Sequence, residues 1–172
     1  MKLHLRGSDP MKFDGDALIL GHFDDICPLT GFLGQLDWVL NASISKLWKK
    51  RPDLFQFGTI TLLATQGKIS ASQVLLVGLG SKDKFNREMR REAFTLGFSS
   101  AAGIGAEKLA IEAFPVNGDR DRNIDKDLIK SFPSTGNALG GKLFLYVGSP
   151  ELLTVLSDRI KDSKVDPTVG PG

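Results

Sequence analysis

Two glycine-containing segments follow apolar runs and could bring a ligand close to the backbone. Residues 78–80 read Gly-Leu-Gly and follow the run 74–77, while Gly21 and His22 follow the run 17–20. Glycine allows close approach to the main chain, and open α/β sheets bind ligands at the carboxyl ends of their strands. We therefore predict that any small-molecule site lies at this sheet edge and includes Gly21, His22, Asp24, Asp25, Gly78, Gly80 and Ser81.

Three further segments resemble nucleotide or metal sites but lack a required residue. Residues 136–142 match G-x-x-x-x-G-K, yet leucine follows where magnesium binding needs Ser or Thr, and the segment precedes a predicted strand. The glycine pair at 78–80 has Asp83 at the third glycine position of a dinucleotide fingerprint. Residues 119–123 have the opening spacing of a calcium loop, but Ile124 replaces its glycine. We interpret all three as loops or turns.

Histidine and cysteine offer no recognisable catalytic set. His4 and His22 are far apart in sequence, and neither belongs to a helical metal pair. The single cysteine, Cys27, excludes an internal disulfide and has no basic neighbour in sequence that would activate it as a nucleophile. The sequence therefore predicts no catalytic residue, no metal ligand and no cofactor.

A local cluster of basic residues stands between positions 82 and 91. Such clusters usually form the solvated face of a loop and a helix, and we interpret this one so, with an anion site as the alternative. Its members are Lys82, Lys84, Arg87, Arg90 and Arg91.

The composition predicts one globular domain without a strong electrostatic field. The chain has 172 residues, 41% of them hydrophobic, and a net charge of +2, which favours neither nucleic acid nor a membrane as partner. No window approaches the roughly 20 apolar residues of a membrane span, and the first residues do not resemble a secretory signal. We expect a cytoplasmic domain over residues 1–164 and a flexible tail over 165–172.

The hydrophobic pattern alternates between strands and helices. Continuous apolar runs in 16–23 and 73–79 predict strands covered on both faces, and apolar residues at helical spacing predict one helix over 30–51. Residues 115–127 are polar and are predicted to form turns. The other predicted elements are strands at 2–6, 58–65, 108–114 and 142–147, a helix from Asn86 to about Gly103, and a final helix after Ser149. This order predicts a three-layer αβα fold with a mixed, largely parallel sheet.

Four segments together resemble the N-terminal domain of the leucyl (cytosol) aminopeptidases. They are residues 15–25, 28–31, 74–85 and 87–93, in the order and spacing of that family, and the likeness extends over residues 14–114. The resemblance implies a macro-domain-like fold that contributes to oligomer assembly and to active-site access. In that family a second domain carries the two-metal peptidase site with its N-T-D-A-E-G-R motif, and no segment of this sequence matches the motif.

Three functional hypotheses follow from this resemblance. The leading one is a non-catalytic interaction or regulatory domain that self-associates or docks onto a protein partner. The first alternative is a macro-type domain that binds ADP-ribose or another nucleotide, although Leu20 and Phe23 occupy the two asparagine positions of the D-A-I-V-N-A-A-N strand of such domains. The second alternative is part of a metal-dependent aminopeptidase whose catalytic domain lies on another chain or outside this sequence.

Overall fold

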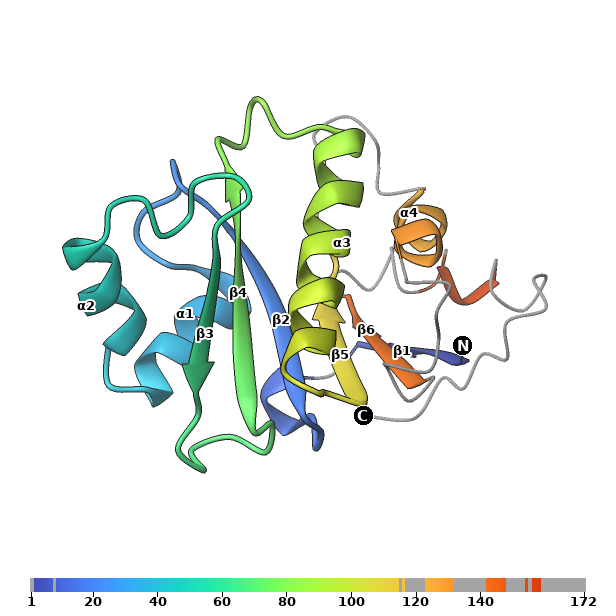
Figure 1. Cartoon of the computed structure of the whole chain (residues 1–172), viewed down its shortest axis with the longest axis horizontal. Coiled ribbons are helices and arrows are strands. Elements are labelled where there is room, and N and C mark those ends of the chain that lie inside the picture. Colours follow the sequence, from blue (N-terminus) through green and yellow to red (C-terminus); the bar gives the residue numbers. More distant parts are fainter. Residues whose placement is uncertain are drawn as a thin grey trace.

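A mixed β-sheet forms the middle layer of the molecule (Figure 1). The computed structural model describes residues 2–7, 9–114, 116, 123–131, 142–147, 154 and 156–158. Within them the six strands have the order β1-β6-β5-β2-β4-β3, and only β3 runs antiparallel to its neighbour. The strands are β1 (Lys2–Arg6), β2 (Ala17–Phe23), β3 (Ile60–Ala64), β4 (Gln73–Gly80), β5 (Lys108–Glu112) and β6 (Lys142–Tyr146).

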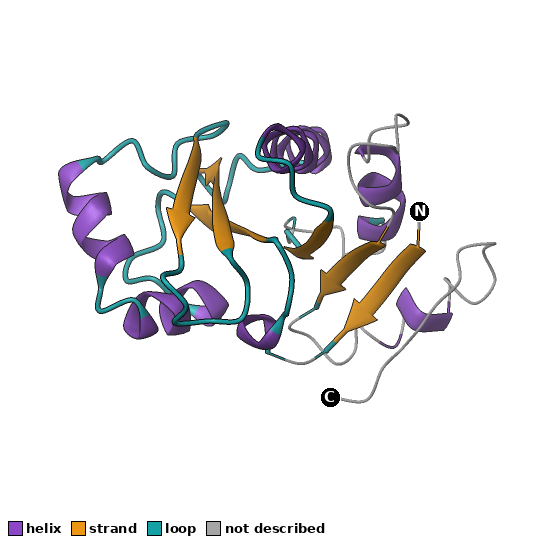
Figure 2. Cartoon of the chain, turned by 60° about the horizontal axis from the view of Figure 1, so that its bottom comes forward, coloured by secondary structure: helices purple, strands orange, loops and turns teal. Residues whose placement is uncertain are grey.

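Helices cover both faces of this sheet (Figure 2). The helices α1 (Gly31–Val39) and α2 (Ser43–Lys50) lie on one face, together with the short 3₁₀ helix η1 (Pro10–Lys12). On the opposite face, α3 (Arg87–Gly103) packs against β4, and α4 (Ile124–Ser131) packs against α3. The structure therefore confirms the predicted three-layer fold with its largely parallel sheet.

The two faces of the sheet bury two separate hydrophobic cores. Along β2, Ile19 points into the core beneath α3, while Leu18 and Leu20 point into the core beneath α1 and α2. Because successive side chains of a strand point to opposite faces, a strand covered on both faces needs apolar residues at every position. This explains the continuous apolar runs of β2 and β4. In β4, the residues from Val74 to Val77 are at most 1% exposed.

The prediction of one helix over residues 30–51 is wrong, because the structure has two helices there, α1 and α2. Asn41 and Ala42 both have φ of +58°, and this left-handed backbone separates α1 from α2. The carboxylate of Asp37 accepts hydrogen bonds from the backbone N–H groups of Ile44 (2.8 Å) and Ser45 (3.0 Å). Asp37 thereby satisfies backbone donors at the start of α2, which lack partners inside the helix.

The turn predicted for residues 115–127 is wrong over its last part, where α4 begins. Ile124 and Leu128 are fully buried against the core beneath α3.

Of the final predicted helix, residues 154 and 156–158 are helical. Three predictions fall on residues outside the described ones. They concern the segment with calcium-loop spacing (119–122), the segment that matches G-x-x-x-x-G-K (136–141) and the predicted tail (165–172). Among the described helices, none has the length and apolar character to cross a membrane.

Candidate functional site

The loops after β2 and β4 are joined by a carboxylate. Asp25 accepts hydrogen bonds from the Ser81 hydroxyl (2.8 Å) and from the Lys82 backbone N–H (3.0 Å), although it is exposed to solvent. The Ser81 hydroxyl and then the Lys82 N–H lower the pKa of Asp25. Nearby, the backbone N–H of Asp24 donates to the carbonyl of Gly80 (3.0 Å). These predicted site residues hold one another in place.

The glycines at the end of β4 pack closely against another segment of the chain and do not face a cavity. A Cβ on Gly78 would lie 2.1 Å from the carbonyl oxygen of Gln56. Gly80 has φ of +68°, and a Cβ there would lie 3.0 Å from the Cβ of Phe57. Segment 55–57 therefore covers this part of the strand, and both glycines are explained by close backbone packing.

His22 is a buried, hydrogen-bonded residue. Its side chain lies edge-on to the rings of Trp48 and Phe55, with centroid distances of 5.7 and 4.8 Å. Its Nε2 lies 2.9 Å from the carbonyl oxygen of Ile26, so Nε2 carries the proton of the neutral ring. Burial lowers the pKa of His22, which keeps the imidazole neutral near pH 7.

A cavity of about 200 Å³ lies where the carboxyl ends of β2, β4 and β5 meet the start of α1. Of the predicted residues, Gly21 and His22 line it, whereas the other five do not. Its charged lining residues are Lys82 and Glu112. Glu112 is not among the predicted site residues, although the sequence contains a signal for it: this carboxylate ends an apolar strand at the sheet edge where ligands bind.

Glu112 is a partly buried carboxyl group at this edge. Burial raises its pKa to about 7. No hydrogen bond or ion pair to its carboxyl group is found among the described residues. A carboxyl group of this kind favours a ligand that brings a donor or a positive charge.

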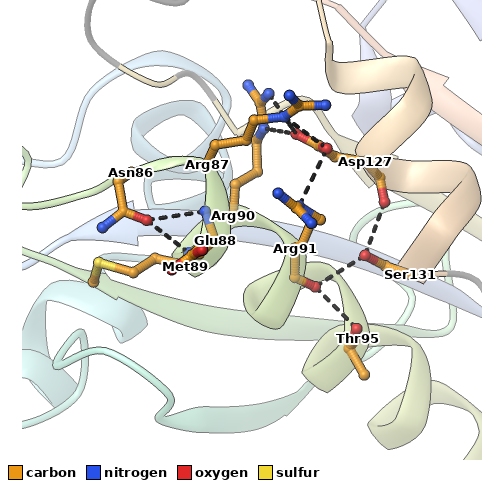
Figure 3. Close-up of polar contacts among 9 residues, drawn as sticks. All are labelled: Asn86, Arg87, Glu88, Met89, Arg90, Arg91, Thr95, Asp127 and Ser131. Carbon is orange, nitrogen blue, oxygen red and sulfur yellow. Dashed lines mark hydrogen bonds and ion pairs between the residues drawn. The ribbon is translucent and has the colours of Figure 1, made fainter.

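The three arginines of the basic cluster converge on Asp127 of α4 (Figure 3), whereas Lys82 and Lys84 are exposed to solvent. Asp127 contacts Arg87 (3.0 Å), Arg90 (2.7 Å) and Arg91 (3.3 Å). The side chains of Arg90 and Asp127 are fully buried, so the interpretation of a solvated face is wrong for Arg90. Burial alone would raise the pKa of Asp127, but hydrogen bonds from Arg87 and Arg90 outweigh burial and lower it.

Neutral hydrogen bonds complete this junction between α3 and α4. The Ser131 hydroxyl contacts the backbone carbonyls of Arg91 (3.0 Å) and Asp127 (2.8 Å), and the Thr95 hydroxyl donates to the Arg91 carbonyl (2.9 Å). At the start of α3, the Asn86 side chain accepts from the N–H groups of Glu88 and Met89, as predicted for a helix cap. The arginines thus serve to attach α4.

Solved structures with the same architecture include macrodomains and a leucine aminopeptidase. A macrodomain of Oceanobacillus iheyensis, solved with ADP, has a TM-score of 0.70 and 8% identity, covering 92% of this chain and 89% of that chain. A tomato leucine aminopeptidase mutant has a TM-score of 0.66 and 16% identity, covering 91% of this chain and 34% of that chain. The fold is therefore macrodomain-like.

Sequence comparison gives the family within this fold. The model of the cytosol aminopeptidase family, N-terminal domain, matches residues 29–127, more than half of the chain, and the chain belongs to this family. A probable cytosol aminopeptidase of Geotalea uraniireducens is 30% identical over 106 residues, and one of Sulfurihydrogenibium sp. is 36% identical over 76 residues. The matches cover 59% and 44% of this chain but only 20% and 15% of those relatives.

Proposed function

We propose that this chain is a non-catalytic interaction domain that self-associates by pairing β3 with β3 of a second copy. The observation that supports the proposal is the open edge of the sheet at β3, which pairs with β4 on one side only among the described residues. Its sequence, Ile-Thr-Leu-Leu-Ala, contains neither charge nor proline, the devices that usually protect an edge strand from pairing. Leu62 at its centre is 47% exposed.

Backbone hydrogen bonds determine which residues of β3 face the open edge. At one end Thr59 O accepts from Gly78 N (2.8 Å), and at the other Thr65 N donates to Ser72 O (3.5 Å), so the odd-numbered residues bond towards β4. Because the direction alternates along an antiparallel strand, the N–H and C=O groups of the even-numbered residues point outward. These are Ile60, Leu62 and Ala64.

One antiparallel register matches these outward groups with themselves. A twofold axis at Leu62 places Leu62 opposite Leu62 and Ile60 opposite Ala64 of the second copy. The outward N–H and C=O groups of one copy then face those of the other and can form hydrogen bonds. The segment 56–67 contains no charged residue, and Lys68 would face the neutral Gln56. Like charges therefore do not oppose each other across the pair.

Sedimentation equilibrium of the wild type and two substituted chains tests the proposal. We expect a dimer for the wild type and a monomer for Leu62→Lys, because the pair would place two ammonium groups opposite each other. Ile129→Lys is the matched control: it also replaces an exposed residue, 38% accessible, but lies on α4, and should remain dimeric. A monomeric wild type at high concentration, or a dimeric Leu62→Lys, would contradict the proposal.

Binding of ADP-ribose or another nucleotide remains the second candidate, because related folds include a macrodomain solved with ADP-ribose. In this chain Leu20 and Phe23 are 1% and 6% exposed, and the nearby cavity of about 200 Å³ is smaller than the roughly 300–1,000 Å³ of typical ligand pockets. Both observations favour the interaction domain. Saturable heat on titration with ADP-ribose or AMP, with no dimer in sedimentation, would reverse this order.

A further inference from the structure

The cavity at the carboxyl edge combines one acidic wall with one basic wall. Glu112, the last residue of β5, supplies the acidic side and has no partner among the described residues. Lys82, in the loop after β4, supplies the basic side. A ligand with a single charge would be attracted by one of these side chains and repelled by the other.

The start of α1 adds backbone donors to the wall of the cavity. Thr30, Gly31 and Leu33 line the cavity, and the Thr30 side chain makes no capping hydrogen bond. The N–H groups of a first helical turn have no partner within the helix, and the helix dipole makes this end positive. A carboxylate bound at this end of the helix would therefore meet backbone donors.

The remaining walls are apolar and limit the size of the ligand. Phe23, Ile26, Leu79 and Phe114 line the cavity beside the polar groups. Its volume of about 200 Å³ corresponds to roughly seven water molecules at about 30 Å³ each. This space suits a molecule of fewer than about ten non-hydrogen atoms with a short apolar part.

We infer that this cavity binds a small zwitterion, namely a free α-amino acid with a short aliphatic side chain. The ammonium group contacts the carboxylate of Glu112. The carboxylate of the ligand faces Lys82 and the first turn of α1, and the aliphatic side chain packs against Phe114 and Ile26. This binding function is independent of the self-association proposed for β3.

The charges around the cavity predict how binding depends on pH. Glu112 must be ionised to hold an ammonium group, and its pKa of about 7 means that the ionised fraction rises between pH 6 and 8. The lowered pKa of His22 keeps it neutral in this range, and Asp25 is hydrogen-bonded to Ser81 and Lys82. We expect the affinity to increase several-fold from pH 6 to pH 8.

Titration calorimetry with L-valine and its two halves tests the inference. Isobutylamine keeps the ammonium but lacks the carboxylate, and isovalerate keeps the carboxylate but lacks the ammonium. We expect saturable binding of L-valine and at least tenfold weaker binding of each half. No saturable heat with L-valine, or equal affinity for isobutylamine, would overturn the inference.

Two isosteric or near-isosteric variants assign the contacts. Glu112→Gln should weaken L-valine binding at least tenfold, remove its pH dependence and leave the weak isovalerate binding intact. Lys82→Gln should weaken isovalerate but leave isobutylamine unaffected or bound more tightly. Circular dichroism verifies that both variants are folded. L-Valine binding that is unchanged in a folded Glu112→Gln protein would overturn the assignment.

Discussion

At the scale of single residues, Asp127 is the carboxylate that links α4 to three arginines of α3. It is a fully buried carboxylate that faces three arginines, one of them also fully buried. Removing one partner of a buried ion pair is costly because the remaining charge stays buried and uncompensated. Besides the buried apolar residues of α4, this carboxylate therefore contributes to the attachment of α4 to α3.

We predict that Asp127→Asn lowers the free energy of unfolding by about 3–5 kcal/mol, measured by urea denaturation at pH 7. Asp53→Asn is the control, because Asp53 pairs with Arg51 at the surface, where the side chains are 48% and 51% exposed and solvent weakens the ion pair, so a much smaller change is expected. Equal midpoints for wild type and Asp127→Asn would show that α4 is attached by apolar contacts alone.

The same pair of proteins should differ in pH dependence. The folded pKa of Asp127 is lowered, so its stabilising contribution is complete above the unfolded value of about 3.9 and is lost as the pH falls through the folded value. The difference in stability between wild type and Asp127→Asn should therefore shrink below about pH 4. A difference that stays constant from pH 7 to pH 3 would contradict the role of the charge.

Residue-level predictions from sequence succeeded where the interaction is local. Asn86 lies two and three residues from the N–H groups that it caps, so the sequence alone contains the pattern. Arg90 and Asp127 are separated by 37 positions, and their pairing depends on how α4 docks. Although its position after an apolar strand is visible in the sequence, the lack of a partner for Glu112 among the described residues becomes apparent only when the ends of three strands are placed together.

At the scale of elements, the break between α1 and α2 is the main departure from the sequence pattern. Leu36, Leu40 and Ile44 belong to one core and keep helical spacing, so the periodicity continues across the break. The backbone nevertheless turns at Asn41 and Ala42, where Asp37 caps the next helix. Hydrophobic periodicity reports which side chains are buried, and it does not report the backbone path between them.

We predict that Ala42→Gly stabilises the protein by up to about 1 kcal/mol, because Ala42 has φ of +58° and a left-handed conformation costs an L-residue roughly 1–2 kcal/mol. Ala102→Gly is the matched control within α3, where the same change should cost about 0.5–1 kcal/mol. Thermal unfolding of both variants measures the two effects. A loss of stability in both would mean that the strain at Ala42 is absent.

At the scale of the whole molecule, the domain corresponds to a minor part of its relatives. The match to the Geotalea protein covers 20% of that protein, and the peptidase motif N-T-D-A-E-G-R is absent from this sequence. The described residues contain no cluster of three or more His, Cys, Asp or Glu residues that could hold a metal ion. A two-metal peptidase needs such a set of ligands.

We predict that the purified chain does not hydrolyse leucine p-nitroanilide in the presence of zinc, manganese or magnesium. A family aminopeptidase that contains both domains serves as the positive control under the same conditions. Metal-dependent turnover that follows the pure chain through two chromatographic steps would instead favour a peptidase site in this chain.

The sheet order places β1 beside β6, two strands that are far apart in the sequence. Lys2 of β1 is in register with Lys142 of β6, so 140 positions separate two neighbours in the sheet. During synthesis on the ribosome at about 5–20 residues per second, the first strand waits roughly 7–28 s before its neighbour exists. β1 therefore pairs with β6 only after residue 142 has been added, and a nascent chain stalled before that residue carries β1 without this neighbour.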